Sequence, residues 1–175
     1  MRVELGHYIR AIPDFPVQGI LFRDITPLLS APEAFAYVVS EFAQWARHKE
    51  AEVIVGIESR GFIFGAPVAV QLGLPFVPVR KPDKLPWEIL SVEYKLEYGL
   101  GRLDIHRDAL AHGQRAVIID DLIATGGTAA AAADLVQQLG AHVAGFEFVV
   151  ELAGLDGRAR IAGHDVNSLV IYPGA

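Results

Sequence analysis

The chain has 175 residues, 52% of them hydrophobic, which is enough for one well-buried domain and too short for two ordinary ones. Its formal net charge of −6 argues against nucleic acid as a partner, because a nucleic-acid-binding face carries an excess of Lys and Arg. The absence of cysteine excludes disulfides and thiolate metal sites. Because the sequence shows neither a charged leader nor an apolar run of about 20 residues, we expect a cytoplasmic protein with no membrane contact.

The N-terminal part of the chain predicts two helices separated by a broken segment. Residues 3–11 favour a short helix because apolar residues recur on one face. Prolines and a glycine interrupt this pattern over residues 13–19, and Pro32 is typical of the first turn of a new helix. The inward face of that second helix is expected to consist of Phe35, Val38, Val39, Phe42 and Ala46.

From residue 53 onward, apolar runs typical of buried strands alternate with helical segments. We expect strands over 53–57, 75–79, 116–120, 142–151 and 168–172, and helices over 61–72, 128–139 and 155–162. This alternation predicts an α/β fold, a mainly parallel twisted sheet flanked by helices, in which ligands gather at the carboxyl ends of the strands.

One long segment, residues 80–106, breaks the alternation. It is charged and contains prolines, and only residues 94–98 within it indicate a strand, a weak one. Three of the four lysines of the chain, Lys81, Lys84 and Lys95, fall here, whereas the chain otherwise uses arginine. Clustered ammonium groups favour phosphate binding, although chance clustering on a solvated loop would give the same pattern. A connection of this length in a compact domain is usually functional or disordered.

The most informative segment is VIIDDLIATGGT, residues 117–128. An apolar strand leads into Asp120 and Asp121, which we place in a turn at its carboxyl end, and small residues then lead into an alanine-rich helix. Helix N-termini offer unpaired backbone N–H groups to a phosphate, and glycines let the ligand approach the backbone. Carboxylates one loop upstream can accept hydrogen bonds from sugar hydroxyls or hold a hydrated metal ion. The segment therefore predicts a sugar-phosphate site.

Two other interpretations of this segment explain only part of its pattern. An apolar strand ending in acids also occurs in phosphate-loop NTPases, but the GxxxxGK[ST] motif of those proteins appears nowhere in the chain. A purely structural turn would not require the DD and TGGT groups together. The sugar-phosphate interpretation accounts for both.

A second candidate anion site is the ESRG segment, residues 58–61, which follows the predicted strand 53–57. Arg60 would lie at the start of a helix, where a cation opposes the helix dipole and an anionic ligand would relieve the conflict. An exposed loop arginine is the plainer alternative. Because both segments leave the carboxyl ends of strands, we expect them to meet in one cleft.

The DDLIATGGT segment resembles the signature of the type I phosphoribosyltransferases, which use phosphoribosyl pyrophosphate (PRPP). The resemblance extends to FPVQGILFRDITPLL, IESRGFIFGAPVA, VRKPDKLP and YKLEYG, in the expected order from about residue 8 to the C-terminus, and is strongest to the members that act on adenine. It implies a single domain over 1–175, with a small hood at about 1–32 that covers the base and a flexible lid at about 80–106.

The resemblance also implies a role for each candidate residue. Ribose and 5-phosphate would be bound by Asp120, Asp121, Leu122, Ala124, Thr125, Gly126, Gly127 and Thr128. Pyrophosphate would be bound by Glu58, Ser59, Arg60, Arg80, Lys81 and Lys84, with a cis peptide between Glu58 and Ser59. Glu58 itself departs from the Asp usual at this position, and its longer side chain could alter metal geometry.

Base recognition would fall to the hood, with Phe22 stacking on the purine, Leu21 offering backbone groups and Arg23 supporting the site. Relatives that act on 6-oxopurines usually have Asp where this chain has Ala124. Glu97 is the expected catalytic group, exchanging a proton with the purine, and Tyr98 would lie beside it. On spacing alone, Phe22 would be an ordinary core aromatic and Glu97 a solvated carboxylate.

The implied reaction converts adenine and PRPP into AMP and pyrophosphate. Mg²⁺ would be held mainly by PRPP and water, with no direct protein ligand and with Asp120 and Asp121 nearby. A homodimer is implied, with Arg80 contributing across its interface. Three alternatives stay open: a phosphoribosyltransferase for another base, a non-catalytic PRPP-binding regulator, and a domain of a PRPP-forming kinase.

Overall fold

The computed structural model describes residues 3–95 and 99–174, and its centre is a parallel five-stranded sheet. The strand order is β4-β3-β7-β8-β9, and every pair is parallel. The strands span β3 Val53–Ile57, β4 Phe76–Val79, β7 Arg115–Ile123, β8 His142–Leu152 and β9 Val166–Tyr172. The predicted parallel sheet is thus confirmed.

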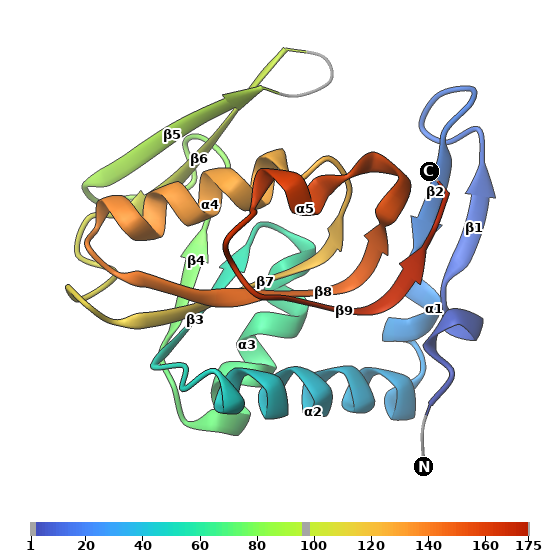
Figure 1. The fold of residues 1–175 in the computed structure, drawn as a ribbon, viewed down its shortest axis with the longest axis horizontal. Coiled ribbons are helices and arrows are strands. Elements are labelled where there is room, and N and C mark those ends of the chain that lie inside the picture. Colours follow the sequence, from blue (N-terminus) through green and yellow to red (C-terminus); the bar gives the residue numbers. More distant parts are fainter. Residues whose placement is uncertain (1–2, 96–98, 175) are drawn as a thin grey trace.

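Helices cover both faces of this sheet (Figure 1). Helices α2 (Pro32–His48) and α3 (Arg60–Leu72) lie on one face, and α4 (Gly127–Gln138) lies on the other, with the short α5 (Gly157–Arg160) beside it. Each face has its own apolar core, one built on the alanines of α4 and one on α2 and α3. The predicted inward residues of α2 all pack into the second core.

The hood is built from small elements that precede α2 and lie beyond the β9 edge of the sheet (Figure 1). They are η1 (Leu5–Tyr8), the antiparallel strands β1 (Arg10–Pro13) and β2 (Leu21–Asp24), and α1 (Thr26–Leu29). The predicted helix over 3–11 is wrong beyond Tyr8, because residues 10 and 11 pair with β2 instead. Pairing with a partner strand overrides a helical period only two turns long.

The lid contains a two-stranded antiparallel hairpin of β5 (Ile89–Lys95) and β6 (Leu100–His106). The weak strand expected over 94–98 therefore starts earlier, and residues 96–98 lie outside the described residues. Arg80 and Asp104 form a backbone bridge that ties the foot of the hairpin to the end of β4. Asp104 is fully buried and accepts hydrogen bonds from Ser91 and from two nitrogens of Arg102.

Strand β7 is longer than predicted, and this corrects the place of the acidic residues. The sequence predicts a strand ending at residue 120 and an acidic turn after it, whereas β7 continues to Ile123. The reason is that β8 continues alongside and pairs with Asp120, Leu122 and Ile123. Asp120 and Asp121 therefore lie on a rigid strand.

The other differences from the predicted elements are small. Helix α3 begins at Arg60, and the predicted helix over 155–162 is divided into η2 (Ala153–Leu155) and α5. Among the described residues, no helix combines the length and apolar character needed to cross a membrane.

Candidate active site

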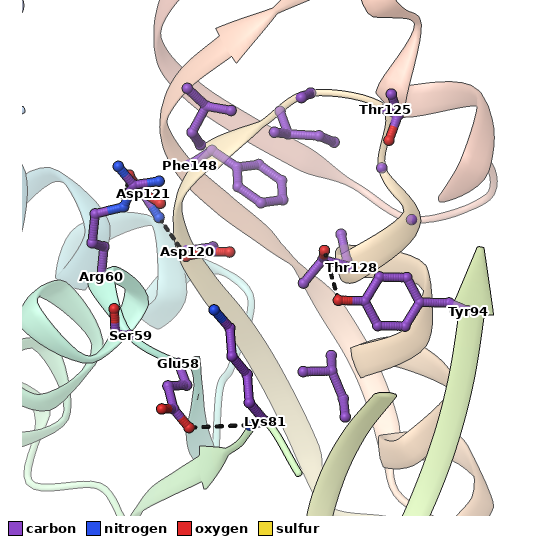
Figure 2. A pocket seen from close by; sticks show the side chains of 17 residues that line it. Glu58, Ser59, Arg60, Lys81, Tyr94, Asp120, Asp121, Thr125, Thr128 and Phe148 are labelled. Carbon is purple, nitrogen blue, oxygen red and sulfur yellow. Dashed lines mark hydrogen bonds and ion pairs between the residues drawn. The ribbon is translucent and has the colours of Figure 1, made fainter. Parts of the chain in front are cut away.

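A cleft of about 400 Å³ opens at the carboxyl end of the sheet (Figure 2). Four parts of the chain line it: the loop 58–60, Lys81 after β4, residues of the lid hairpin, and the continuous segment 120–129. Phe148 of β8 lies beneath them. The prediction that the ESRG and DDLIATGGT segments meet in one cleft is confirmed.

The acidic pair, Asp120 and Asp121, lies at the centre of one wall of this cleft. Asp120 is half-buried, and its Oδ1 accepts a hydrogen bond from the backbone N–H of Asp121 at 2.9 Å. Burial raises the pKa of Asp120 well above its ordinary value, and the charge of Asp121 raises it further. Burial also raises the pKa of Asp121, although the charge of Arg60 opposes the shift.

Arg60 connects the acidic pair to the hood. Its Nε lies 2.9 Å from Oδ2 of Asp121, whose exposed fraction is 3%, although the two groups are not aligned as a hydrogen bond. The guanidinium carbon also lies 5.6 Å from the centre of the Phe22 ring. Because Arg60 is the first residue of α3, its charge opposes the helix dipole, and Asp121 supplies a compensating charge.

The phosphate loop, residues 124–128, joins β7 to α4. Gly126 has a left-handed φ of 78°, and a Cβ at this position would collide with the carbonyl oxygen of Gly157 in α5. Gly126 is the N-cap of α4 and has no side chain that could cap the helix. The N–H groups of the first turn, which lies at the cleft, are therefore free of a side-chain cap. This geometry suits a bound phosphate.

The loop that precedes α3 places its carboxylate away from the acidic pair. The peptide between Glu58 and Ser59 is cis, as predicted. Oε2 of Glu58 accepts hydrogen bonds from Arg80 Nε and from the backbone N–H of Lys81, both at 3.0 Å. Burial alone would raise the pKa of Glu58, but these hydrogen bonds hold it below its ordinary value. Glu58 thus holds the chain at Arg80 and Lys81.

A glycine at position 61 is required by the close approach of α3 to β7. A Cβ on Gly61 would lie 2.6 Å from the carbonyl oxygen of Ile119 and 3.1 Å from Oδ1 of Asp120. Any larger residue would push the start of α3, and with it Arg60, away from the acidic pair.

The remaining predicted residues fall into three groups. Lys81 lines the cleft and extends toward Asp120 (Figure 2), whereas Arg80 and Lys84 do not line it, and Arg80 donates to the carbonyl oxygen of Lys84. The base-binding candidates Leu21, Phe22 and Arg23 lie on β2 and do not line the cleft, although the ring of Phe22 lies near Arg60, which does. The guanidinium of Arg23 stacks on Tyr172 of β9 at 3.7 Å. Glu97 and Tyr98 lie outside the described residues.

Sequence reasoning missed five residues of the cleft: Tyr94, Leu103, Ile123, Ala129 and Phe148. Leu103 and Phe148 belong to apolar strand patterns that predict only a core position. Tyr94 carried a signal, because it precedes Glu97 in the YKLEYG segment, but a lone tyrosine on a weak strand does not reveal its contacts.

Comparison with known proteins gives a consistent result. A family model described as phosphoribosyl transferase domain matches residues 29–171. An adenine phosphoribosyltransferase of Synechococcus sp. is 56% identical over 170 residues, covering 97% of this chain and 99% of the relative.

Solved structures agree. The crystal structure of adenine phosphoribosyltransferase from Thermoanaerobacter pseudethanolicus is 51% identical, with a TM-score of 0.93 and coverage of 97% and 98% of the two chains. The Saccharomyces cerevisiae enzyme, complexed with an imino-altritol bisphosphate and adenine, is 41% identical, with a TM-score of 0.90 over 95% of this chain and 96% of that chain. The chain therefore belongs to the phosphoribosyl transferase family and, within it, to the adenine phosphoribosyltransferases, which form AMP and pyrophosphate from adenine and PRPP.

Proposed function

We propose that the cleft at the carboxyl end of the sheet is the site where this chain transfers the phosphoribosyl group of PRPP to adenine. One observation carries the proposal: the acidic pair and the phosphate loop line the same cavity, and the loop ends at the uncapped N-terminus of α4. A sugar that carries a phosphate needs hydrogen-bond acceptors and an anion site close together.

The 5-phosphate would bind at the phosphate loop, where Thr125 and Thr128 add hydroxyl donors to the backbone N–H groups of Gly126 and Gly127. Leu122 and Ala124 lie in the same segment, and the small side chain of Ala124 leaves room beside the ligand. The ribose hydroxyls would donate to Asp120 and Asp121. Negative carboxylates also stabilise the positive charge that develops on the sugar as pyrophosphate leaves.

The pyrophosphate would lie between Ser59, Arg60 and Lys81, which line the cleft beside the acidic pair and across from the phosphate loop (Figure 2). In this account Glu58 acts indirectly, because its carboxylate already accepts from Arg80 and Lys81. Arg80 and Lys84 would add positive charge near the rim. Binding of pyrophosphate gives Arg60 a second anion to contact in addition to Asp121.

Adenine would bind between the cleft and the hood. Phe22 would stack on the purine, since its ring lies 5.6 Å from the guanidinium carbon of Arg60, a residue of the cleft, and Leu21 would offer backbone groups. Arg23 would support β2 through its contact with Tyr172. A purine nitrogen forms a bond to the anomeric carbon while the bond from that carbon to pyrophosphate breaks. Glu97, with Tyr98 beside it, would take the proton that the purine releases.

Mg²⁺ fits the donor set of the cleft. No group of three or more His, Cys, Asp or Glu side chains converges within residues 3–95 and 99–174, but the half-buried Asp120 borders the cavity. Mg²⁺ usually keeps several waters and binds through one or two carboxylates plus substrate phosphates. Asp120 and Asp121 would lie next to such an ion, which would neutralise charge on the leaving pyrophosphate.

We further propose that residues 1–175 form one phosphoribosyltransferase domain, with the hood at about 1–32 and the lid at about 80–106, which works as a homodimer in the cytoplasm. Val70 of α3 and Trp87 at the foot of the lid expose 82% and 66% of their surface, and a second copy would cover such apolar side chains. Light scattering coupled to gel filtration measures the assembly, and a monomer at micromolar concentration contradicts it.

The activity is tested by incubating the protein with PRPP, Mg²⁺ and one base at a time: adenine, hypoxanthine, guanine or orotate. We expect AMP from adenine and little product from the other bases. Turnover of hypoxanthine or guanine at a rate equal to that of adenine would contradict the base assignment. No product with any base would contradict the proposed site.

A further inference from the structure

Tyr94 reaches from the lid hairpin to the phosphate loop. It lies on β5, and its phenolic oxygen accepts a hydrogen bond from Oγ1 of Thr128 at 3.3 Å (Figure 2). Thr128 is the second residue of α4, and its hydroxyl is one of the two that the loop offers to a ligand. The contact therefore joins two parts of the cleft that are 34 residues apart in the sequence.

Two glycines make room for this tyrosine. Gly101 is the cross-strand partner of Tyr94 in the hairpin, and a Cβ on Gly101 would lie 2.6 Å from Cζ of the ring. On the other side, a Cβ on Gly127 would lie 3.4 Å from Cδ2 of the ring and 3.3 Å from the carbonyl oxygen of Lys95. The ring is thus held between β6 and the phosphate loop, with its hydroxyl directed at Thr128.

The direction of the hydrogen bond between two hydroxyls is free to change. Each hydroxyl has one proton to donate and can accept two hydrogen bonds, whereas a phosphate oxygen only accepts. When Thr128 donates its proton to a phosphate, Oγ1 still accepts from Tyr94. In such a chain each hydrogen bond polarises the next, so the tyrosine strengthens the donor that the phosphate meets.

We propose that Tyr94 is a positioning residue for the 5-phosphate of PRPP and AMP: it orients the Thr128 hydroxyl and donates to it when phosphate is bound. The inference rests on the proposed function of the phosphate loop. Thr128 lies on one side of the cleft, and the proposed pyrophosphate residues Ser59, Arg60 and Lys81 lie on the other (Figure 2). Tyr94 should therefore affect binding of the 5-phosphate and not binding of pyrophosphate.

The test compares two ligands, AMP and inorganic pyrophosphate, by titration calorimetry with Mg²⁺ present. Tyr94→Phe removes the hydroxyl and keeps the ring. We expect the Kd for AMP to rise about 3- to 10-fold, the range for one net hydrogen bond, with no change in the Kd for pyrophosphate. In steady-state assays the KM for PRPP rises while kcat stays within about twofold, since a uniform binding contact is lost.

A double-mutant cycle isolates the contact. Thr128→Val also removes the hydroxyl, and in that background Tyr94→Phe is expected to have no further effect on AMP binding. Gly101→Ala displaces the ring without altering any hydroxyl, and it should weaken AMP binding at least as much as Tyr94→Phe. Tyr37→Phe on α2 is the matched control, because Tyr37 is half-buried against the core of α2 and α3 and does not line the cleft.

Three results would overturn the inference: unchanged AMP binding in Tyr94→Phe, equal weakening of AMP and pyrophosphate, or additive effects in the double variant. The unaltered protein is measured first for AMP formation and AMP binding. If it shows neither, the proposed function fails. If it shows both while Tyr94→Phe behaves like Tyr37→Phe, only the role of Tyr94 fails.

Discussion

Two adjacent strands of the sheet each carry carboxylates with raised pKa values, and the two places differ in every other respect. On β7, Asp120 and Asp121 line the cleft and face Arg60. On β8, Glu147 is 0% exposed within the apolar layer, and burial raises its pKa to about 9. Asn167 donates one hydrogen bond to Oε2 of Glu147, while Oε1 has no hydrogen-bond partner within the described part of the chain.

The comparison shows that a raised pKa does not by itself identify an active site. Burial is the largest cause in both places, but only the acidic pair adds a like charge, a cation and access to a cavity. A ligand that enters the cavity can interact with the paired carboxylates and with the cation, whereas no ligand can reach Glu147. Glu147 is neutral at pH 7 and belongs to the core, so changes on the two strands should affect different properties of the protein.

The largest effect is expected at a third carboxylate, Glu97 of the lid. Glu97→Ala removes the proposed proton acceptor, so kcat should fall about 10²- to 10⁴-fold while KM for adenine changes much less. Steady-state AMP formation measures both constants. Glu93→Gln, four residues earlier on an exposed position of β5, is the control and should leave both unchanged. A normal kcat in Glu97→Ala rejects the catalytic role.

Asp120→Asn should lower the activity of the protein and raise its stability. The loss of charge-assisted hydrogen bonds to the ribose should lower kcat/KM for PRPP about 10- to 150-fold. The melting temperature should rise, because the pKa of Asp120 is raised in the folded state and its charge therefore destabilises the fold above the ordinary pKa of Asp. Calorimetry without ligand measures the second effect, and a lower melting temperature would contradict the account.

The charge of Arg60 lowers the pKa of both members of the acidic pair, against the larger effect of burial. Arg60→Gln should therefore move the acid limb of the profile of kcat/KM for PRPP to higher pH. The variant also loses a pyrophosphate contact at every pH. The informative quantity is therefore the midpoint of the acid limb, and an unmoved midpoint would show that the ion pair does not control protonation.

Glu147→Gln should give the smallest effect on catalysis and a clear effect on stability. Because the folded pKa is raised from 4.5 to about 9, the contribution of Glu147 to stability is fully present below pH 4.5 and is lost as pH rises toward 9. The amide removes this dependence, and we expect a gain of about 1–3 kcal/mol at pH 8 with normal activity. Denaturant unfolding at pH 5 and pH 8 measures it. Equal pH dependence in both proteins contradicts the assignment.

Much of the fold could be predicted because its strands are buried on both faces. Residues 53–57 are apolar throughout, and β3 has the predicted bounds. The acidic pair and the phosphate loop could be located because two adjacent carboxylates and a TGGT segment interrupt the apolar pattern where a strand passes into a helix. The end of β7 could not be predicted, since Asp120, Leu122 and Ile123 pair with residues of β8 that lie 28 positions later in the sequence.

The parts of the site that sequence could not supply are contacts between distant segments. Nothing near Glu58 indicates that its carboxylate is occupied by Arg80 and Lys81, and nothing near Tyr94 indicates Thr128. Gly101 and Gly61 are informative only once the backbone is known, because each marks where another residue approaches closely. From the sequence alone, such residues are indistinguishable from ordinary loop or strand residues.

A crystal structure with Mg²⁺ and PRPP would show whether the acidic pair and the phosphate loop together bind the sugar phosphate of PRPP. We expect the 5-phosphate against the N–H groups of residues 125–128 and the ribose hydroxyls within hydrogen-bond distance of Asp120 and Asp121. Clear density for PRPP elsewhere, with this cleft holding only water, would contradict it.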